Sequence, residues 1–271
     1  MKINNFSSNF RARSPRIRKA DKIVRNVNNN FPMFSNTYAG RRWVLFNSGP
    51  ENFYRYYDKL EEVRKNIVQM RADVDELSKD DKYILGLFDI IKNKKSGNCY
   101  EGSWITLGAL CANGFIASQR ASVGIEIKVI DKRAGNVVHR YLDGYDHTML
   151  LASMGKDIKK IEEYVVIDPW LNKAMSYSEA KETYISMLKD WYLDNKINDA
   201  KNEFIDKMRE DYAILGKKLP VDFDIDNYSF EPHIVFVRYD YDHDINGEDE
   251  ANEFGDLVRE KYPELIINRL R

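Results

Sequence analysis

The chain has 271 residues, of which 43% are apolar and 13% aromatic, so it is long and apolar enough to fold around a substantial core. Its formal net charge of −1 argues against wholesale binding to nucleic acid. It contains no run of about 18 apolar residues and no signal-peptide pattern, which argues against a transmembrane segment and against classical export.

The first segment in chain order, residues 1–42, is rich in Asn, Ser and Arg, and Asp21 is its only acidic residue. Such a composition offers little apolar area to offset the entropy of ordering. We therefore expect a flexible basic segment, with at most a short helix around Ala20 to Val27. Its role stays open between a solvated tail, a surface for anionic partners such as lipid headgroups, and a secretion signal.

Residues 43–271 are expected to form one domain, entered through a short strand over residues 38–46. Apolar residues then recur at spacings of three and four across residues 51–76 and 80–92. This periodicity predicts two amphipathic helices.

A glycine-led turn, Gly97-Asn98-Cys99, delivers a cysteine into an apolar run that is expected to be helical to about Ala117. A thiol at the start of a helix lies beside unpaired backbone N–H groups, which favour the thiolate and therefore a nucleophile. The second cysteine, Cys111, would lie roughly 18 Å further along the same helix, too far for a disulfide. We interpret it as a small buried apolar residue.

Alternating and β-branched stretches after this helix predict an antiparallel sheet. The expected strands are 124–130, 137–142, 147–152 and 164–168, with a further member at 233–239. Helices are expected again over 178–193, 199–215 and 249–262. The order predicts an α+β fold in which the helical part, carrying the nucleophile helix, packs on an antiparallel sheet.

Two of these strands carry residues that could complete a nucleophilic site. His147 follows Asp146 at the start of an apolar run, and Asp168 ends the run Val165 to Asp168 before Pro169. A cysteine, a histidine and a carboxylate can act as nucleophile, base and orienting group. Each residue alone is more often structural, and the combination of the three local patterns favours the catalytic interpretation. His139, His233 and His243 are assigned no function.

At these three motifs the chain resembles the papain-like cysteine hydrolase superfamily, and in particular its bacterial secreted effector and toxin branch. Gly97-Asn98-Cys99 is similar to the nucleophile turn of that branch, Asp146-His147 to its histidine strand, and Asp168-Pro169-Trp170 to its acid segment. The resemblance covers roughly residues 96–170. No glutamine stands upstream of Cys99 where papain-type proteases place an oxyanion donor, so Asn98 or Asn93 is the candidate for that role.

The resemblance implies a thiol-dependent amide hydrolase that acts on a protein, most simply a host protein, and needs no cofactor. It favours a glutamine deamidase, with a thiol protease or a transglutaminase using the same thioacyl intermediate as alternatives. It further implies a virulence effector that is secreted without a signal peptide, with a secretion chaperone at its N-terminus, and that acts in the host cytosol; otherwise the protein is cytoplasmic. A different class of function, an interaction protein built on a papain-like scaffold, remains open.

One further pattern has the spacing of a metal site. Asp242, Asp244, Asn246 and Glu253, with Gly247 between them, fit the spacing of a calcium-binding loop. A strand rather than a helix precedes the loop, which favours an acidic solvated turn, and we assign no metal ligands.

Overall fold

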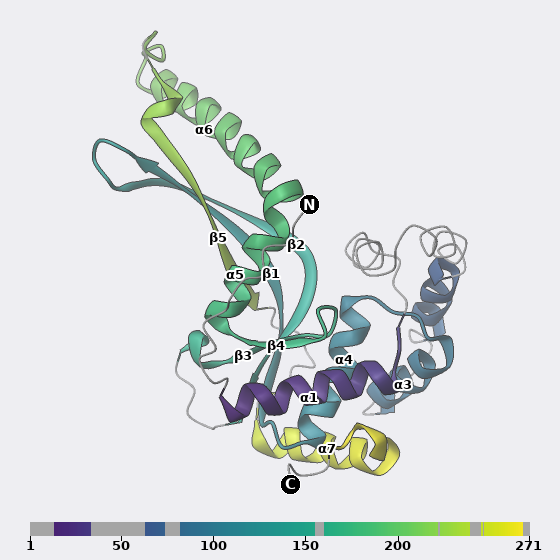
Figure 1. The fold of residues 1–271 in the computed structure, drawn as a ribbon. Helices are drawn as coiled ribbons and strands as arrows, with labels where there is room; N and C mark the ends of the chain where they lie inside the picture. The colour runs from purple at the N-terminus through teal and green to yellow at the C-terminus, as the bar shows by residue number, and fades with distance from the viewer. Residues whose placement is uncertain are drawn as a thin grey trace, which may run out of the picture. The chain divides into compact units, whose positions relative to one another are not determined.

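The computed structural model describes residues 14–33, 63–73, 82–154, 160–221, 223–238, 245 and 247–267. The chain divides into two compact units, drawn in one ribbon in Figure 1. Unit 1 comprises Met1–Gln119, Met149–Ser176 and Asp242–Arg271, and unit 2 comprises Arg120–Thr148 and Tyr177–Tyr241. The sequence predicted one domain over residues 43–271, and this stays a prediction because a division into compact units does not test it.

The fold is α+β, as predicted, with an antiparallel sheet in the strand order β4-β3-β2-β1-β5. The strands are β1 (Ala117–Asp131), β2 (Val137–Ser153), β3 (Val165–Asp168), β4 (Lys173–Ser176) and β5 (Tyr228–Arg238). The two strands expected over residues 137–142 and 147–152 are a single long strand, β2. The edge strand β4 was not predicted, because its four residues are too few to show an alternation.

The helices lie in both units. Unit 1 contains α1 (Pro15–Asn30), a helical segment over residues 63–73, α3 (Lys82–Lys94), α4 (Cys99–Ala112) and α7 (Glu248–Lys261), and unit 2 contains α5 (Tyr177–Leu188) and α6 (Asp194–Ile214). These bounds confirm the helices predicted over 80–92, 178–193, 199–215 and 249–262, and residues 63–73 are helical within the helix predicted over 51–76, the rest of which lies outside the described residues. Among the described helices, none is both long and apolar enough to cross a bilayer. The strand expected over residues 38–46 lies outside the described residues.

Helix α4 forms the centre of unit 1, and every one of its residues except Tyr100 is buried. A helix that is apolar on all sides is stable only when neighbours cover every face. Figure 1 shows α1, α3 and α7 around it. The helix ends at Ala112, five residues before the predicted end, because Gly114 has φ +81° and Asn113 caps the last turn.

Helix α1 differs most from the sequence prediction. Residues 14–33 were expected to belong to a flexible segment, and the helix considered there was only Ala20 to Val27. The structure has a helix of 16 residues, begun by the Ser14 cap and by Pro15. Four of its apolar residues are completely buried in the core: Ala20, Ile23, Val24 and Val27.

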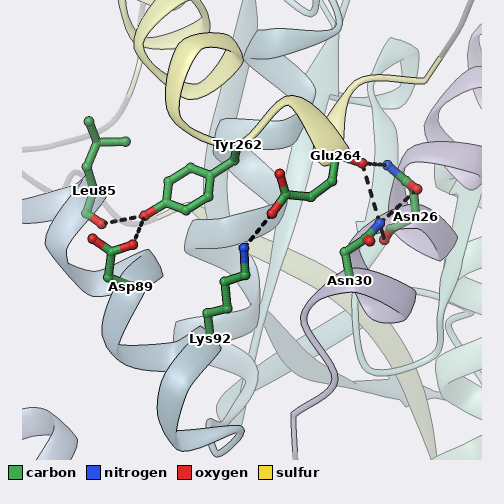
Figure 2. A network of polar contacts seen from close by, with 7 residues as sticks. All are labelled: Asn26, Asn30, Leu85, Asp89, Lys92, Tyr262 and Glu264. Carbon is green, nitrogen blue, oxygen red and sulfur yellow. Dashed lines mark hydrogen bonds and ion pairs between the residues drawn. The ribbon is translucent and has the colours of Figure 1, made fainter.

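A polar network ties α1 and α3 to the chain after α7 (Figure 2). Lys92 Nζ lies 2.6 Å from Glu264 Oε1, and Asn26 Nδ2 donates to the Glu264 carbonyl oxygen at 2.7 Å. The Tyr262 hydroxyl lies 2.6 Å from Asp89 Oδ1. Three segments far apart in the sequence are thereby held together in unit 1.

Unit 2 is built on the pairing of β1 with β5, which runs from Ala121 opposite Arg238 to Asp131 opposite Tyr228. Aromatic side chains join its helices to the sheet. Phe204 of α6 packs edge-on against Tyr228 with ring centroids 4.9 Å apart, and Tyr184 of α5 packs against Phe236 at 6.0 Å.

Candidate functional site

Cys99 is the first residue of α4 and lies in unit 1. Its cap residue, Asn98, has an extended backbone with φ −112° and ψ −171°, so the helical conformation begins at the cysteine itself. The side chain of Cys99 is 8% exposed and forms no disulfide. The sequence prediction of a cysteine at the start of a helix is therefore confirmed.

Glu101 holds this turn from inside the protein. Its Oε2 accepts a hydrogen bond from the Asn98 backbone N–H at 2.7 Å, and its Oε1 lies 3.1 Å from Arg71 Nε on the 63–73 helical segment. Glu101 is only 2% exposed. Glu101 was not among the predicted site residues, although Asn98 followed three residues later by a glutamate is the pattern of a capping box.

Asp168 ends β3 in unit 1 and is completely buried. Its Oδ1 accepts hydrogen bonds from the backbone N–H groups of Trp170 at 2.8 Å and Leu171 at 3.2 Å. Backbone donors of this kind favour a charged carboxylate with one fixed orientation.

The structure brings the beginning of α4 and the turn after Asp168 together. A methyl group added to Gly102 would lie 3.5 Å from Pro169 Cβ, which is ordinary van der Waals contact. Ile167, the residue before Asp168, packs instead into the hydrophobic core that includes α4. The contact between the nucleophile helix and the acid segment is thus made just beyond the end of β3, at Pro169.

His147 lies on β2 in unit 2 and is 7% exposed. Its ring packs against Tyr184 of α5, with the centroids 5.9 Å apart and the planes at 58°. The strand continues from His147 into the segment that pairs with β3, where Leu150 stands opposite Ile167. His147 therefore lies on a strand, as the sequence predicted, and the structure adds that it is buried.

Cys111 lies on α4 and is buried, as expected. Burial, and secondly the charge of Glu250, raises the pKa of its thiol to about 12. Cys111 therefore remains a thiol at any physiological pH and serves as an internal control for Cys99.

Asn93 and Asn98 are the candidates for the second oxyanion donor. Asn93 is exposed on α3, and the backbone N–H of Asn98 is occupied by Glu101.

The part of the chain that the structure describes contains no group of three or more His, Cys, Asp or Glu residues placed to hold a metal ion. Of the calcium pattern, Asp242, Asp244 and Asn246 lie outside the described residues.

No family model matches the chain, no curated protein matches it, and no solved structure matches it. The interpretation of the site therefore depends on the residues and their geometry.

Proposed function

We propose that the chain is a cysteine-dependent amide hydrolase of the papain-like type, with Cys99 as nucleophile, His147 as general base and Asp168 as the group that orients the imidazole. The observation that carries the proposal is the position of Cys99, the first residue of a buried helix whose entry turn is fixed by Glu101. Unpaired N–H groups at such a position can stabilise a thiolate and then an oxyanion.

The pairing of His147 with Asp168 rests on the two sequence motifs that carry them, Asp146-His147 and Asp168-Pro169-Trp170.

The reaction would proceed by acyl transfer. His147 takes the proton from Cys99 Sγ, and the thiolate attacks the carbonyl carbon of a carboxamide or peptide bond. The backbone N–H of Cys99 would meet the resulting oxyanion. When the C–N bond breaks, His147 returns the proton to the leaving ammonia or amine, and water then hydrolyses the thioester to regenerate the thiol.

The substrate that we favour is a glutamine side chain of a host protein, which makes the chain a secreted effector deamidase acting in the host cytosol. Proteolysis and transamidation share the thioacyl intermediate. Mass spectrometry of treated proteins assigns the reaction, because deamidation adds about one dalton, proteolysis breaks the chain and transamidation adds an amine.

The proposal predicts how fast iodoacetamide labels Cys99 at different pH values. In the unmodified protein, labelling should remain rapid at pH 6, because an imidazolium partner keeps the sulfur ionised. In His147→Ala, labelling should rise only near pH 8.5, the range of a free thiol. Peptide mass spectrometry distinguishes Cys99 from Cys111.

His139→Ala is the matched control, because His139 is also on β2 and packs edge-on against Tyr141, with the centroids 4.6 Å apart. It should keep the labelling profile of the unmodified protein. If iodoacetamide labelling of Cys99 in the unmodified protein rises only near pH 8.5, Cys99 is a structural residue. That result would favour a non-catalytic interaction protein.

A further inference from the structure

The end of α1 contacts both turns on which the proposed chemistry depends. Asn28 reaches the turn after Asp168, and Met33, which follows the helix, reaches the turn before Cys99. We call Asn28 and Met33 the N-terminal clasp. All of these residues belong to unit 1.

Asn28 holds the turn that follows Asp168. Its Nδ2 donates one hydrogen bond to the Pro169 carbonyl oxygen at 2.9 Å and another to Asn172 Oδ1 at 3.0 Å. Asn172 has φ +51°, a left-handed conformation that needs support in a residue other than glycine. Asn28 is thus bonded to both ends of the turn whose backbone N–H groups bind the Asp168 carboxylate.

Met33 covers the turn that precedes Cys99. A methyl group added to Gly97 would lie 3.0 Å from Met33 Sδ, and one added to Gly102 would lie 3.2 Å from Met33 Cε. The thioether therefore fills the space beside the two glycines that flank Cys99 and its first helical turn. Any side chain at Gly97 would have to displace it.

We propose that the N-terminal clasp is a positioning element of the active site, so that loss of its contacts slows the reaction of Cys99 without any change in Cys99, His147 or Asp168. This inference rests on the proposed function. It gives residues 14–33 a role beyond that of a tail or a secretion signal, because Asn28 contacts the turn after Asp168 and Met33 contacts the turn before Cys99.

The test compares Asn28→Ala with Asn26→Ala in the full-length chain. Asn26 lies on the same helix and also donates an amide hydrogen bond to a carbonyl oxygen, that of Glu264 at 2.7 Å, so both variants lose a similar contact (Figure 2). We expect Asn28→Ala to slow the iodoacetamide labelling of Cys99 at pH 6 by roughly tenfold or more, because small misplacements of catalytic groups have large effects. Asn26→Ala should keep the profile of the unmodified protein.

Met33 provides a second, independent comparison. Met33→Leu keeps most of the volume beside Gly97 and should retain labelling at pH 6, whereas Met33→Ala should lose it. Urea unfolding of all four variants shows whether they are folded under the labelling conditions.

The outcomes separate the two proposals. If Cys99 is labelled equally fast in Asn28→Ala and Asn26→Ala, while the unmodified protein is still labelled rapidly at pH 6, the clasp proposal is wrong and the proposed function is unaffected. A free-thiol profile in the unmodified protein would overturn the proposed function and the clasp with it.

Discussion

At the scale of single residues, Glu101 is the side chain on which the Cys99 turn most depends. Its carboxylate is 2% exposed and connects two partners, the Asn98 N–H and the Arg71 guanidinium. A buried charge of this kind is stable only while it is paired and hydrogen-bonded. The same carboxylate therefore supports both the cap of α4 and the docking of the 63–73 helical segment.

Replacing Glu101 by alanine should lower the free energy of unfolding by about 2 kcal/mol, because the Asn98 N–H loses its partner together with the cap. Arg71→Ala should cost less, about 1 kcal/mol, because the Glu101 carboxylate keeps its hydrogen bond from Asn98 and because water can reach the carboxylate where the 55% exposed Arg71 side chain is removed. Urea unfolding at pH 7 measures both.

Glu101→Gln separates the cap from the charge, because glutamine keeps an acceptor for Asn98 but carries no charge for Arg71. Its stability should fall between those of the two alanine variants. If Arg71→Ala cost as much as Glu101→Ala, the ion pair rather than the cap would hold the turn.

At the scale of elements, the sequence predicted the beginning of α4 better than its end. The glycine-led turn and the apolar run after Cys99 are local signals, and the helix begins at Cys99 as expected. Its end is set by Asn113, whose side chain bonds to Ala109 and, across the fold, to Leu265. The Asn-Gly pair at 113–114 is a local signal for this end. The prediction ran past the pair because apolar residues follow it.

Helix α1 shows why composition alone misjudged the N-terminal segment. Asn, Ser and Arg dominate residues 1–42 as a whole, whereas the buried stripe of α1 needs only four small or β-branched residues at helical spacing. The contacts that make α1 part of the candidate site join residues such as Asn28 and Pro169, 141 positions apart. No local pattern could have indicated them, because they depend on the folded arrangement.

The packing of α7 on α4 provides a prediction about a single methyl group. An alanine Cβ at Gly255 would lie 2.6 Å from the Cys111 carbonyl oxygen and 2.7 Å from its carbon, and these are backbone atoms that cannot rotate away. Gly255→Ala should therefore destabilise unit 1 by about 2 kcal/mol, although alanine normally favours a helix.

Gly144→Ala is the control for this change, because a methyl group there would meet no atom of the described residues within 4 Å. It should alter the free energy of unfolding by less than about 0.5 kcal/mol. Equal stability of Gly255→Ala and the unmodified protein would mean that α7 packs on α4 less closely than the structure shows.

At the scale of the whole molecule, the sequence predicted the α+β class and most strands, because alternation and periodicity are local. It did not predict that two expected strands form one, or that the chain divides into two units across β2. Unit boundaries follow from which segments pack together, and the pairing of Leu150 with Ile167 is a long-range contact. Cys99, His147 and Asp168 lie on the expected elements for the same reason, because the residues next to each of them in the sequence indicate a helix start or a strand.

The network in Figure 2 connects the N-terminal helix, α3 and the chain after α7, and its charges make it sensitive to acid. Burial acts to raise the pKa of Asp89, but hydrogen bonds from Lys261 and Tyr262 outweigh it and lower that pKa. Burial also acts to raise the pKa of Glu264, and the hydrogen bond from Lys92 outweighs it. Carboxyl groups with a lowered pKa stabilise the fold above their ordinary pKa, and this stabilisation disappears as the pH falls through the lowered value.

Tyr262→Phe tests this acid sensitivity through one hydrogen bond. At pH 7 the Asp89 carboxylate is charged, and loss of the Tyr262 hydroxyl, 2.6 Å from Asp89 Oδ1, should lower the free energy of unfolding by about 1 kcal/mol. Below the lowered pKa of Asp89 the carboxylate takes up a proton and the bond weakens, so the difference between the variant and the unmodified protein should shrink. Urea unfolding of both proteins at pH 7 and at a pH below that pKa measures this coupling. The same difference at both values would mean that the hydroxyl acts through the Leu85 carbonyl, 3.0 Å away, which does not titrate.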